Sequence, residues 1–299
     1  MKKLVFAVIL VVMVALIGVF LWWQNTQVHD DATIITTAFP EYDAVRAVIG
    51  DTGLAVEMLL EPGGEIHHFE PTPQDVIDIK KADFILYGGG ESEEWMDELL
   101  KNNGIDDDKT LNLLDIIGPD FNGDEEDEHV WTSPINMVEI VAVVRDELSK
   151  VWPEKKAEFT ANAEKYTTEL QGIDQDLREV VKNARTRTLV FADRFPFYYF
   201  AKEYGLNYEA AFPGCAEQTE ASSKVVAELI DKIKKDDLKV ILKIELSDGK
   251  LAETIANETD AEVMELNSAH NISRADFEND TTYADIMREN VAVLKEALK

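Results

Sequence analysis

Residues 154–184 read EKKAEFTANAEKYTTELQGIDQDLREVVKNA, and this stretch decides the fold. It contains no proline, and its apolar residues recur every three or four positions, at Phe159, Ala163, Tyr166, Leu170, Ile173, Leu177 and Val181. Such spacing is typical of a helix with a narrow apolar stripe and a hydrated opposite face. We predict one long helix laid along two lobes, although the same pattern also suits a coiled-coil arm.

Short apolar runs alternate with segments of helical spacing on both sides of this stretch. Before it, the pattern predicts strands at 33–36, 56–60, 84–87 and 110–114, and helices at 42–49, 74–81, 94–100 and 135–151. After it, the pattern predicts strands at 188–191, 208–212, 240–244 and 263–266, and helices at 197–204, 222–235, 250–259 and 283–298. This alternation is typical of parallel sheets covered by helices.

The predicted fold class is therefore α/β, with two βα lobes that contain parallel sheets and are joined by one long helix. The first lobe should span residues 31–152, the linking helix 153–185 and the second lobe 186–299. Ligands of such sheets bind beyond the carboxyl ends of the strands, so we expect a metal cleft between the two lobes. A rigid linking helix also predicts small lobe movements rather than a wide clamp.

Residues 1–30 are predicted to be a membrane anchor or signal segment. Lys2 and Lys3 precede a run from Leu4 to Trp23 that has no charged residue and is long enough to cross a membrane. The run ends without a small-residue cleavage site, which favours an uncleaved anchor over a signal peptide. The positive-inside bias keeps the two lysines in the cytoplasm, so the remaining chain should lie at the extracytoplasmic face of the membrane.

The chain is strongly acidic, with 59 acidic against 29 basic residues and a formal net charge of −30. Phosphate recognition requires the opposite field, so this charge argues against nucleic acid as a partner. Attraction of cations is compatible with it, and so is a merely solubilising surface. We interpret the acidic run DEEDE at 124–128 as a solvated loop. The single cysteine, Cys215, rules out an intramolecular disulfide.

Three of the five histidines lie in loops that predict a metal site. His67 and His68 stand together in the turn-rich run 62–71, PGGEIHHFEP, and His129 lies in DEHVW at 127–131. Neutral imidazole suits a borderline transition metal, and a loop rich in proline and glycine can present it outward. We interpret His67 and His129 as ligands. The others are peripheral in this interpretation: His68 at the rim, and His29 and His270 exposed to solvent, although His270 could enter the cleft.

These residues resemble the ABC-importer solute-binding proteins that carry zinc or manganese, over nearly all of the chain after the N-terminal segment. The family loop Pro-Gly-x-x-x-His-x-(Phe or Tyr)-x-Pro is matched by 62–71 and selects His67. The family motif Asp-x-His-Val-Trp-x-x-Pro is matched by 127–134 and selects His129. The resemblance implies two βα lobes joined by a single long helix, as the residues alone predict.

The second lobe departs from the commonest pattern of that family. A His or Glu usually precedes a stretch that matches 197–205 here, but this chain has ADRFP at 192–196, where Asp193 is the ligand-capable residue. The exit loop of the last strand usually carries an acidic ligand, whereas Asn267 offers only a neutral oxygen. Cys215 and Glu245 also follow predicted strands and are further candidate donors.

The candidate metal residues are therefore His67, His129, Asp193, Cys215 and Glu245. Asp193 could instead pair with Arg194 or cap the next helix, and Cys215 could be a small buried apolar residue. Glu245 could be a cap or a partner that orients a metal-bound imidazole.

The resemblance implies capture of a divalent transition metal outside the cell and delivery to an ABC permease, with zinc expected first and manganese as the alternative. The protein is then a monomeric binding protein and not an enzyme. A membrane-anchored zinc hydrolase would use the same histidines with Glu245 as general base, but the sequence has no His-Glu-x-x-His motif. A surface adhesin or scaffold with a structural metal differs in that chelation would unfold it.

Overall fold

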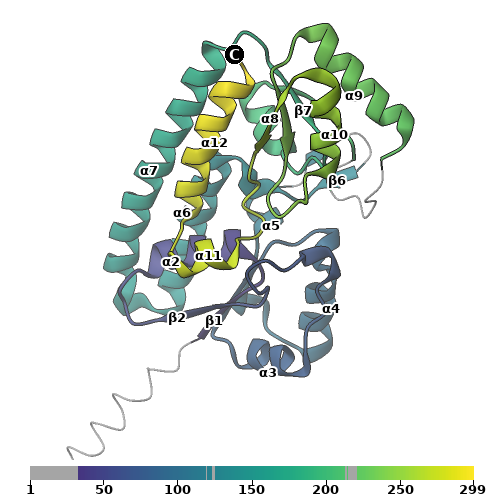
Figure 1. Ribbon diagram of the computed structural model, residues 1–299. Coiled ribbons are helices and arrows are strands. Elements are labelled where there is room, and N and C mark those ends of the chain that lie inside the picture. Colours follow the sequence, from purple (N-terminus) through teal and green to yellow (C-terminus); the bar gives the residue numbers. More distant parts are fainter. Residues whose placement is uncertain (1–32, 119, 123–124, 213, 215–220) are drawn as a thin grey trace, which may run out of the picture.

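The long helix in the middle of the chain is α7, Lys156–Lys182, which runs along one side of the computed structural model (Figure 1). The structure describes residues 33–118, 120–122, 125–212, 214 and 221–299. Every residue of the predicted apolar stripe of α7 is buried. The helix packs against α2 (Phe39–Ile49), α6 (Pro134–Val151) and α12 (Tyr283–Ala297). The prediction of a long helix is confirmed, and its stripe is covered by this chain rather than by a coiled-coil partner.

A four-stranded sheet forms the centre of each lobe. The first has the order β2-β1-β3-β4, with β1 Thr33–Thr36, β2 Ala55–Met58, β3 Phe84–Tyr87 and β4 Thr110–Asn112. The second has the order β10-β9-β7-β8, with β7 Thr188–Phe191, β8 Asn207–Ala210, β9 Val240–Lys243 and β10 Glu262–Glu265. All neighbouring strands are parallel, as predicted. The loops at their carboxyl ends therefore gather at one edge of each sheet.

The remaining predicted helices also form. They are α3 Pro73–Lys81, α4 Glu94–Asn103, α8 Tyr198–Tyr204, α9 Ser223–Asp236 and α10 Lys250–Thr259. Local sequence explains where three helices begin, because the side chains of Thr72, Ser222 and Thr282 accept hydrogen bonds from backbone N–H groups of the first turn of α3, α9 and α12.

Four short elements, α5, β5, β6 and α11, are absent from the predictions. The strand predicted at 110–114 ends at Asn112, whose side chain accepts a hydrogen bond from Leu114 N and so begins helix α5, Leu113–Ile117. An antiparallel pair follows, β5 Asp120–Asn122 with β6 Glu125–Asp127. Helix α11, Arg274–Glu278, is too short to give a periodic pattern.

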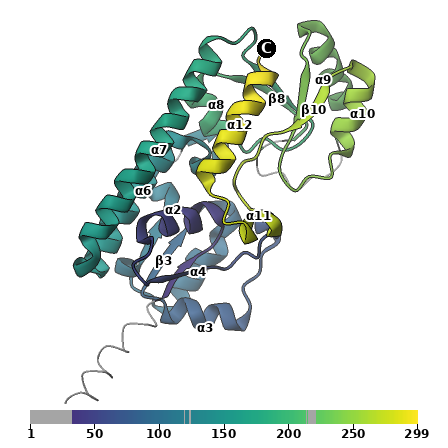
Figure 2. The ribbon, with the colours of Figure 1, turned by 60° about the vertical axis from the view of Figure 1, so that its left-hand side comes forward.

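The chain crosses between the lobes a second time after β10. Trp131 Nε1 donates a hydrogen bond to Ser268 O at 3.1 Å, and Tyr283 Oη donates to Trp131 O at 2.7 Å. Gly63 N donates to Ile272 O at 2.8 Å. The chain then forms α11 and returns beside α7 as α12 (Figure 2). Helix α7 and the segment after β10 therefore both join the lobes. The predicted lobe boundaries at residues 152 and 185 stay predictions.

The predicted membrane segment, residues 1–30, lies outside the described residues. In the described part of the chain, no helix is both long enough and apolar enough to cross a membrane. The assignment of residues 1–30 as an anchor or signal stays a prediction.

Candidate metal centre

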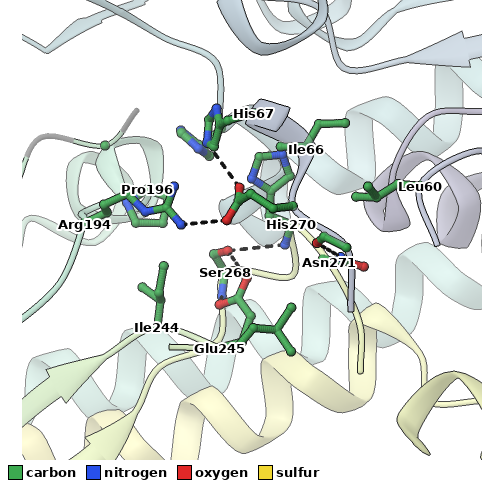
Figure 3. Close-up of a pocket in the computed structure, with 15 residues that line it drawn as sticks. Leu60, Ile66, His67, Arg194, Pro196, Ile244, Glu245, Ser268, His270 and Asn271 are labelled. Carbon is green, nitrogen blue, oxygen red and sulfur yellow. Dashed lines mark hydrogen bonds and ion pairs between the residues drawn. The ribbon is translucent and has the colours of Figure 1, made fainter. Parts of the chain in front are cut away.

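A small pocket of about 50 Å³ lies between the loops of the two lobes (Figure 3). Its polar lining includes His67, His129, His270, Glu65, Arg194 and Glu245. His67 follows β2, whereas Arg194, Glu245 and His270 follow β7, β9 and β10. The pocket thus lies where the carboxyl ends of both sheets meet, as the strand and helix alternation predicts.

His129 is fixed in the first lobe by Asp127. Its side chain is 1% exposed, and Asp127 Oδ1 accepts a hydrogen bond from His129 N at 3.0 Å and lies 3.1 Å from His129 Nδ1. A carboxylate only accepts, so the proton belongs on Nδ1 and Nε2 keeps the lone pair that a metal needs. Burial opposes protonation of the ring, but the hydrogen bond that the ring donates to Asp127 and the charges of Asp127 and Glu128 raise the pKa of His129.

His67 lies in the short helical turn Ile66–His68 and is less deeply buried, with 13% of its side chain exposed. His67 Nε2 is 3.9 Å from Glu65 Oε1, and the other oxygen of Glu65 accepts a hydrogen bond from Arg194 Nη2 at 3.0 Å. Burial would raise the pKa of Glu65, but the hydrogen bond and charge of Arg194 outweigh it and lower that pKa. Glu65 therefore stays ionised beside the imidazole.

His270 lines the pocket, so the prediction that it is exposed to solvent is wrong. Its ring centroid lies 5.8 Å from that of His67 and 5.3 Å from that of His129, with both ring pairs edge to face. Burial lowers the pKa of His270 well below its usual value, and the charges of His129, His67 and Arg194 act in the same direction. The ring is therefore neutral, which is the state that binds a metal. The sequence signal that could have predicted His270 at the pocket is its position three residues after Asn267, in the loop that follows a strand.

Asn267 shapes the turn that carries His270. Its Oδ1 accepts a hydrogen bond from Ala269 N at 2.8 Å, while its backbone N donates to Asn290 Oδ1 at 2.9 Å. Ala269 has a left-handed backbone, with φ of 57°. The amide of Asn267 is thus used within the loop, and the residue that this loop brings to the pocket is His270.

Glu245 lines the pocket but is held by its own lobe. It is 9% exposed, and its carboxylate accepts hydrogen bonds from Ser268 N at 2.7 Å and from Ser268 Oγ at 2.5 Å. Burial raises the pKa of Glu245, although the two bonds from Ser268 oppose that shift. Glu245 therefore braces the loop that carries His270, which supports its alternative interpretation as a positioning partner.

Asp193 is not among the described residues that line the pocket. Asp193 precedes the pocket residue Arg194, and its Oδ1 accepts a hydrogen bond from Arg194 N at 2.9 Å. Its carbonyl oxygen accepts one from Phe212 N at 3.3 Å. Cys215 lies outside the described residues. Ligation by Asp193 or Cys215 stays a prediction.

The acidic run 124–128 is not simply a solvated loop. Asp127 and Glu128 are 4% and 3% exposed. Glu128 Oε2 accepts a hydrogen bond from Ser92 N at 3.0 Å, and its other oxygen accepts one from Ser92 Oγ. These two carboxylates belong to the structure around His129, so the solvated-loop interpretation is wrong for them.

Across the described residues, no group of three or more His, Cys, Asp and Glu side chains is already placed to hold a metal ion. The three imidazoles instead line a common pocket without forming a finished coordination sphere. Imidazole and carboxylate are suitable donors for zinc.

Comparison with known proteins places this chain in a family. The family model described as "Zinc-uptake complex component A periplasmic" matches residues 34–297. The chain is 30% identical over 288 residues to the "Zinc-binding lipoprotein AdcA" of Streptococcus pneumoniae serotype 4, which covers 91% of this chain and 57% of that protein. It is 28% identical over 291 residues to the "High-affinity zinc uptake system protein ZnuA" of Bacillus subtilis, with 90% of this chain and 88% of that protein covered.

A solved structure agrees with this placement. The crystal structure of the Zn(II)-bound ZnuA-like domain of Streptococcus pneumoniae AdcA superposes with a TM-score of 0.77 at 31% identity, and covers 89% of this chain and 98% of that one. The chain spans less than two thirds of the length of the streptococcal AdcA proteins. The family match covers both sheets and every lining residue of the pocket, and the chain therefore belongs to the family of zinc-uptake complex component A proteins.

Proposed function

We propose that the protein captures zinc outside the cytoplasm and delivers it to an ABC permease. The observation that carries the proposal is the meeting of His67, His129 and His270 at one pocket between the lobes. The family description and the names of the zinc-binding relatives support it. Capture requires only that the loops of both lobes contribute donors to one ion, and no chemical step is involved.

The donor set favours zinc over manganese. Imidazole suits zinc, whereas manganese prefers carboxylate, carbonyl and water oxygens. Among the described residues, three imidazoles line the pocket, and the two lining carboxylates, Glu65 and Glu245, already accept hydrogen bonds from protein groups. A manganese carrier remains the alternative, and it would need oxygen donors such as Asp193 to turn inward.

Binding is a better account of this pocket than hydrolysis. A zinc hydrolase needs a general base within reach of metal-bound water, and Glu245 is the carboxylate that the sequence offers for it. Both of its hydrogen bonds from Ser268 hold it in its own lobe. The family is also described as a zinc-uptake component.

The expected location is the extracytoplasmic face of the membrane, where the apolar run of residues 4–23 would hold a monomer near its permease. Relatives named lipoproteins support attachment to a membrane, although this chain has no cysteine near that run. Because α7 and the 267–283 segment both join the lobes, we expect small movements on binding. Small-angle scattering that shows a large compaction with zinc would contradict this.

The direct test is competitive titration of the purified protein with zinc and manganese. One zinc ion should bind tightly to the unmodified chain, and His67→Ala or His270→Ala should weaken it by at least about 100-fold. The matched control is His68→Ala, which should leave the affinity unchanged. Asp193→Ala, Cys215→Ser and Glu245→Ala then show which further donors take part. If neither metal binds the unmodified chain tightly, the proposal fails.

Chelation separates a carrier from a scaffold with a structural metal. A carrier should remain folded when a chelator removes zinc, with only a lower unfolding temperature, because the ligand stabilises the folded state by mass action. Loss of the circular dichroism of the folded protein on chelation would instead indicate a structural metal.

A further inference from the structure

Glu65 and Arg194 form an ion pair across the pocket, from loops of different lobes. Glu65 lies three residues after Pro62 in the first lobe, and Arg194 follows β7 in the second. Arg194 Nη2 donates to Glu65 Oε2 at 3.0 Å, while Glu65 Oε1 lies 3.9 Å from His67 Nε2. Both side chains line the pocket. The carboxylate of Glu65 therefore lies between the guanidinium of Arg194 and the imidazole of His67, a candidate ligand.

The distance from Glu65 to His67 is close to that between two ligands of one ion. Zinc lies about 2.0–2.2 Å from imidazole nitrogen and carboxylate oxygen, which in tetrahedral geometry separates two donors by about 3.3–3.6 Å. The observed 3.9 Å exceeds this only slightly. A small turn of the Glu65 side chain would make the two atoms partners on one ion.

The charge of the ion is a second reason to expect Glu65 as a ligand. Three neutral imidazoles leave the charge of a divalent ion uncompensated in a buried site, which is costly unless an anion lies beside it. Glu245 is already held by two hydrogen bonds from Ser268. Glu65 is the other carboxylate among the described lining residues, and its Oε1 oxygen lies near His67 Nε2.

We propose that Glu65 exchanges partners: it pairs with Arg194 while the pocket is empty and becomes an anionic ligand when zinc enters. Arg194 then competes with the metal, both by holding Glu65 and by placing a positive charge at the pocket. This inference rests on the proposed function, and it assigns the control of affinity to a pair of residues outside the predicted ligand set. A pair that weakens binding also eases release to a permease.

The test is a double-mutant cycle on zinc affinity, measured in the full chain by competition with a chelator. Glu65→Gln removes the anion, keeps the size of the side chain, and should weaken zinc binding by at least about tenfold. Arg194→Gln should tighten binding by roughly three- to tenfold, because the competitor is lost. In the Glu65→Gln background the same Arg194 change should have a clearly smaller effect.

The matched control is a second ion pair between neighbouring segments, Arg274 with Glu61, at 3.7 Å and with both side chains more than two thirds exposed. Glu61→Gln and Arg274→Gln should leave zinc affinity unchanged, since that pair does not line the pocket. If all four single changes weaken binding alike, the pairs merely hold the lobes together and the proposal is wrong. Tighter binding after Arg194→Gln cannot arise from a lost link between the lobes.

Cobalt(II) provides a readout of ligation itself. It replaces zinc in many sites, and its visible absorption depends on the number and kind of its ligands. At saturating cobalt, Glu65→Gln should change the spectrum and Glu61→Gln should not. If the unmodified chain binds no zinc, the proposed function fails; if it binds zinc and Glu65→Gln alters neither affinity nor spectrum, only this inference fails.

Discussion

The two lobes hold their parts of the pocket in different ways. In the first lobe, His129 is almost fully buried and is fixed by Asp127 at both its backbone N and its Nδ1. In the second lobe, Arg194 carries a charge into the pocket, and its partner Glu65 belongs to the opposite loop. The part of the pocket formed by His129 and Asp127, here called the fixed wall, is therefore set before an ion arrives. The opposite part, the adjustable wall, contains the Glu65–Arg194 pair, which joins the two lobes and which an ion must rearrange.

This difference suggests separate tasks for the two walls. A ligand whose orientation is already fixed loses little conformational entropy on binding, so the first lobe provides a reference position for the ion. A wall with competing charges reduces affinity but allows release. Both tasks are useful for a carrier that must bind tightly and then deliver its cargo.

The strongest test of the fixed wall is His129→Ala. Removing the buried ligand should weaken zinc binding by at least about 1,000-fold, or about 4 kcal/mol, because the ion loses a donor whose orientation the fold already fixes. Competition titration measures the loss, and circular dichroism of the metal-free variant checks that the fold survives. A loss below tenfold with the fold intact would mean that the fixed wall does not bind the ion.

Most of the fold could be predicted from the sequence because its elements are long or strongly periodic. The buried run FILY became β3, and the spaced apolar residues of 154–184 became the packed stripe of α7. The pair β5 and β6 was missed because acidic residues have low strand propensity, so DEEDE resembles a solvated loop. Helix α11 spans little more than one turn, which is too short for a periodic signal.

The site was predictable where it follows local motifs. His67 and His129 lie in distinctive loops, and both line the pocket. His270 was misjudged because its surroundings arise from a tertiary crossing, in which Trp131 Nε1 bonds to Ser268 O from the other lobe. No local pattern reveals such a contact. The pairing of Glu65 with Arg194 spans 129 positions of sequence and is invisible for the same reason.

Buried carboxylates behind the fixed wall should make the stability of this protein depend on pH. Burial, assisted by the charge of Glu128, raises the pKa of Glu93 from its usual 4.5 to about 7. The neutral form is favoured in the folded state, so its contribution is complete below pH 4.5 and is lost as the pH rises through 7. Glu93→Gln stays neutral and should be more stable than the parent at pH 8 by up to about 3 kcal/mol.

Chemical unfolding at pH 5 and pH 8 measures this effect. The parent should lose stability between the two values, whereas Glu93→Gln should lose less. Glu94→Gln is the matched control, since Glu94 is the exposed neighbour of Glu93 and should leave the pH dependence unchanged. Equal pH dependence in all three proteins would show that ionisation of the buried Glu93 does not destabilise the folded state.

A milder change tests how the fixed wall is oriented. Asp127→Asn keeps an acceptor for His129 N but removes the negative charge beside Nδ1. Partners of this kind orient metal-bound imidazole, and their loss typically costs about 10–100-fold in metal affinity. Isothermal titration with zinc checks the effect. An unchanged affinity would show that burial alone is enough to orient His129.

The smallest effect on zinc affinity is expected from Ser268→Ala, a change to the hydrogen bonds that support His270 in the second lobe. This variant removes the Oγ hydrogen bond to Glu245 and the bond that Oγ accepts from His270 N at 3.3 Å. It keeps the bond from Ser268 N, so the loop of His270 loses one of its two bonds to the carboxylate of Glu245. A hydrogen bond to a charged group contributes about 1.5–3 kcal/mol to stability. The unfolding temperature should therefore fall, while zinc affinity should change less than about tenfold if Glu245 acts as a positioning partner rather than as a ligand. A loss of zinc affinity as large as that of Asp127→Asn would show that His270 needs its hydrogen-bonded support as much as His129 does. A gain in zinc affinity would show that a freed Glu245 becomes a ligand, and Glu245 would then belong to the adjustable wall.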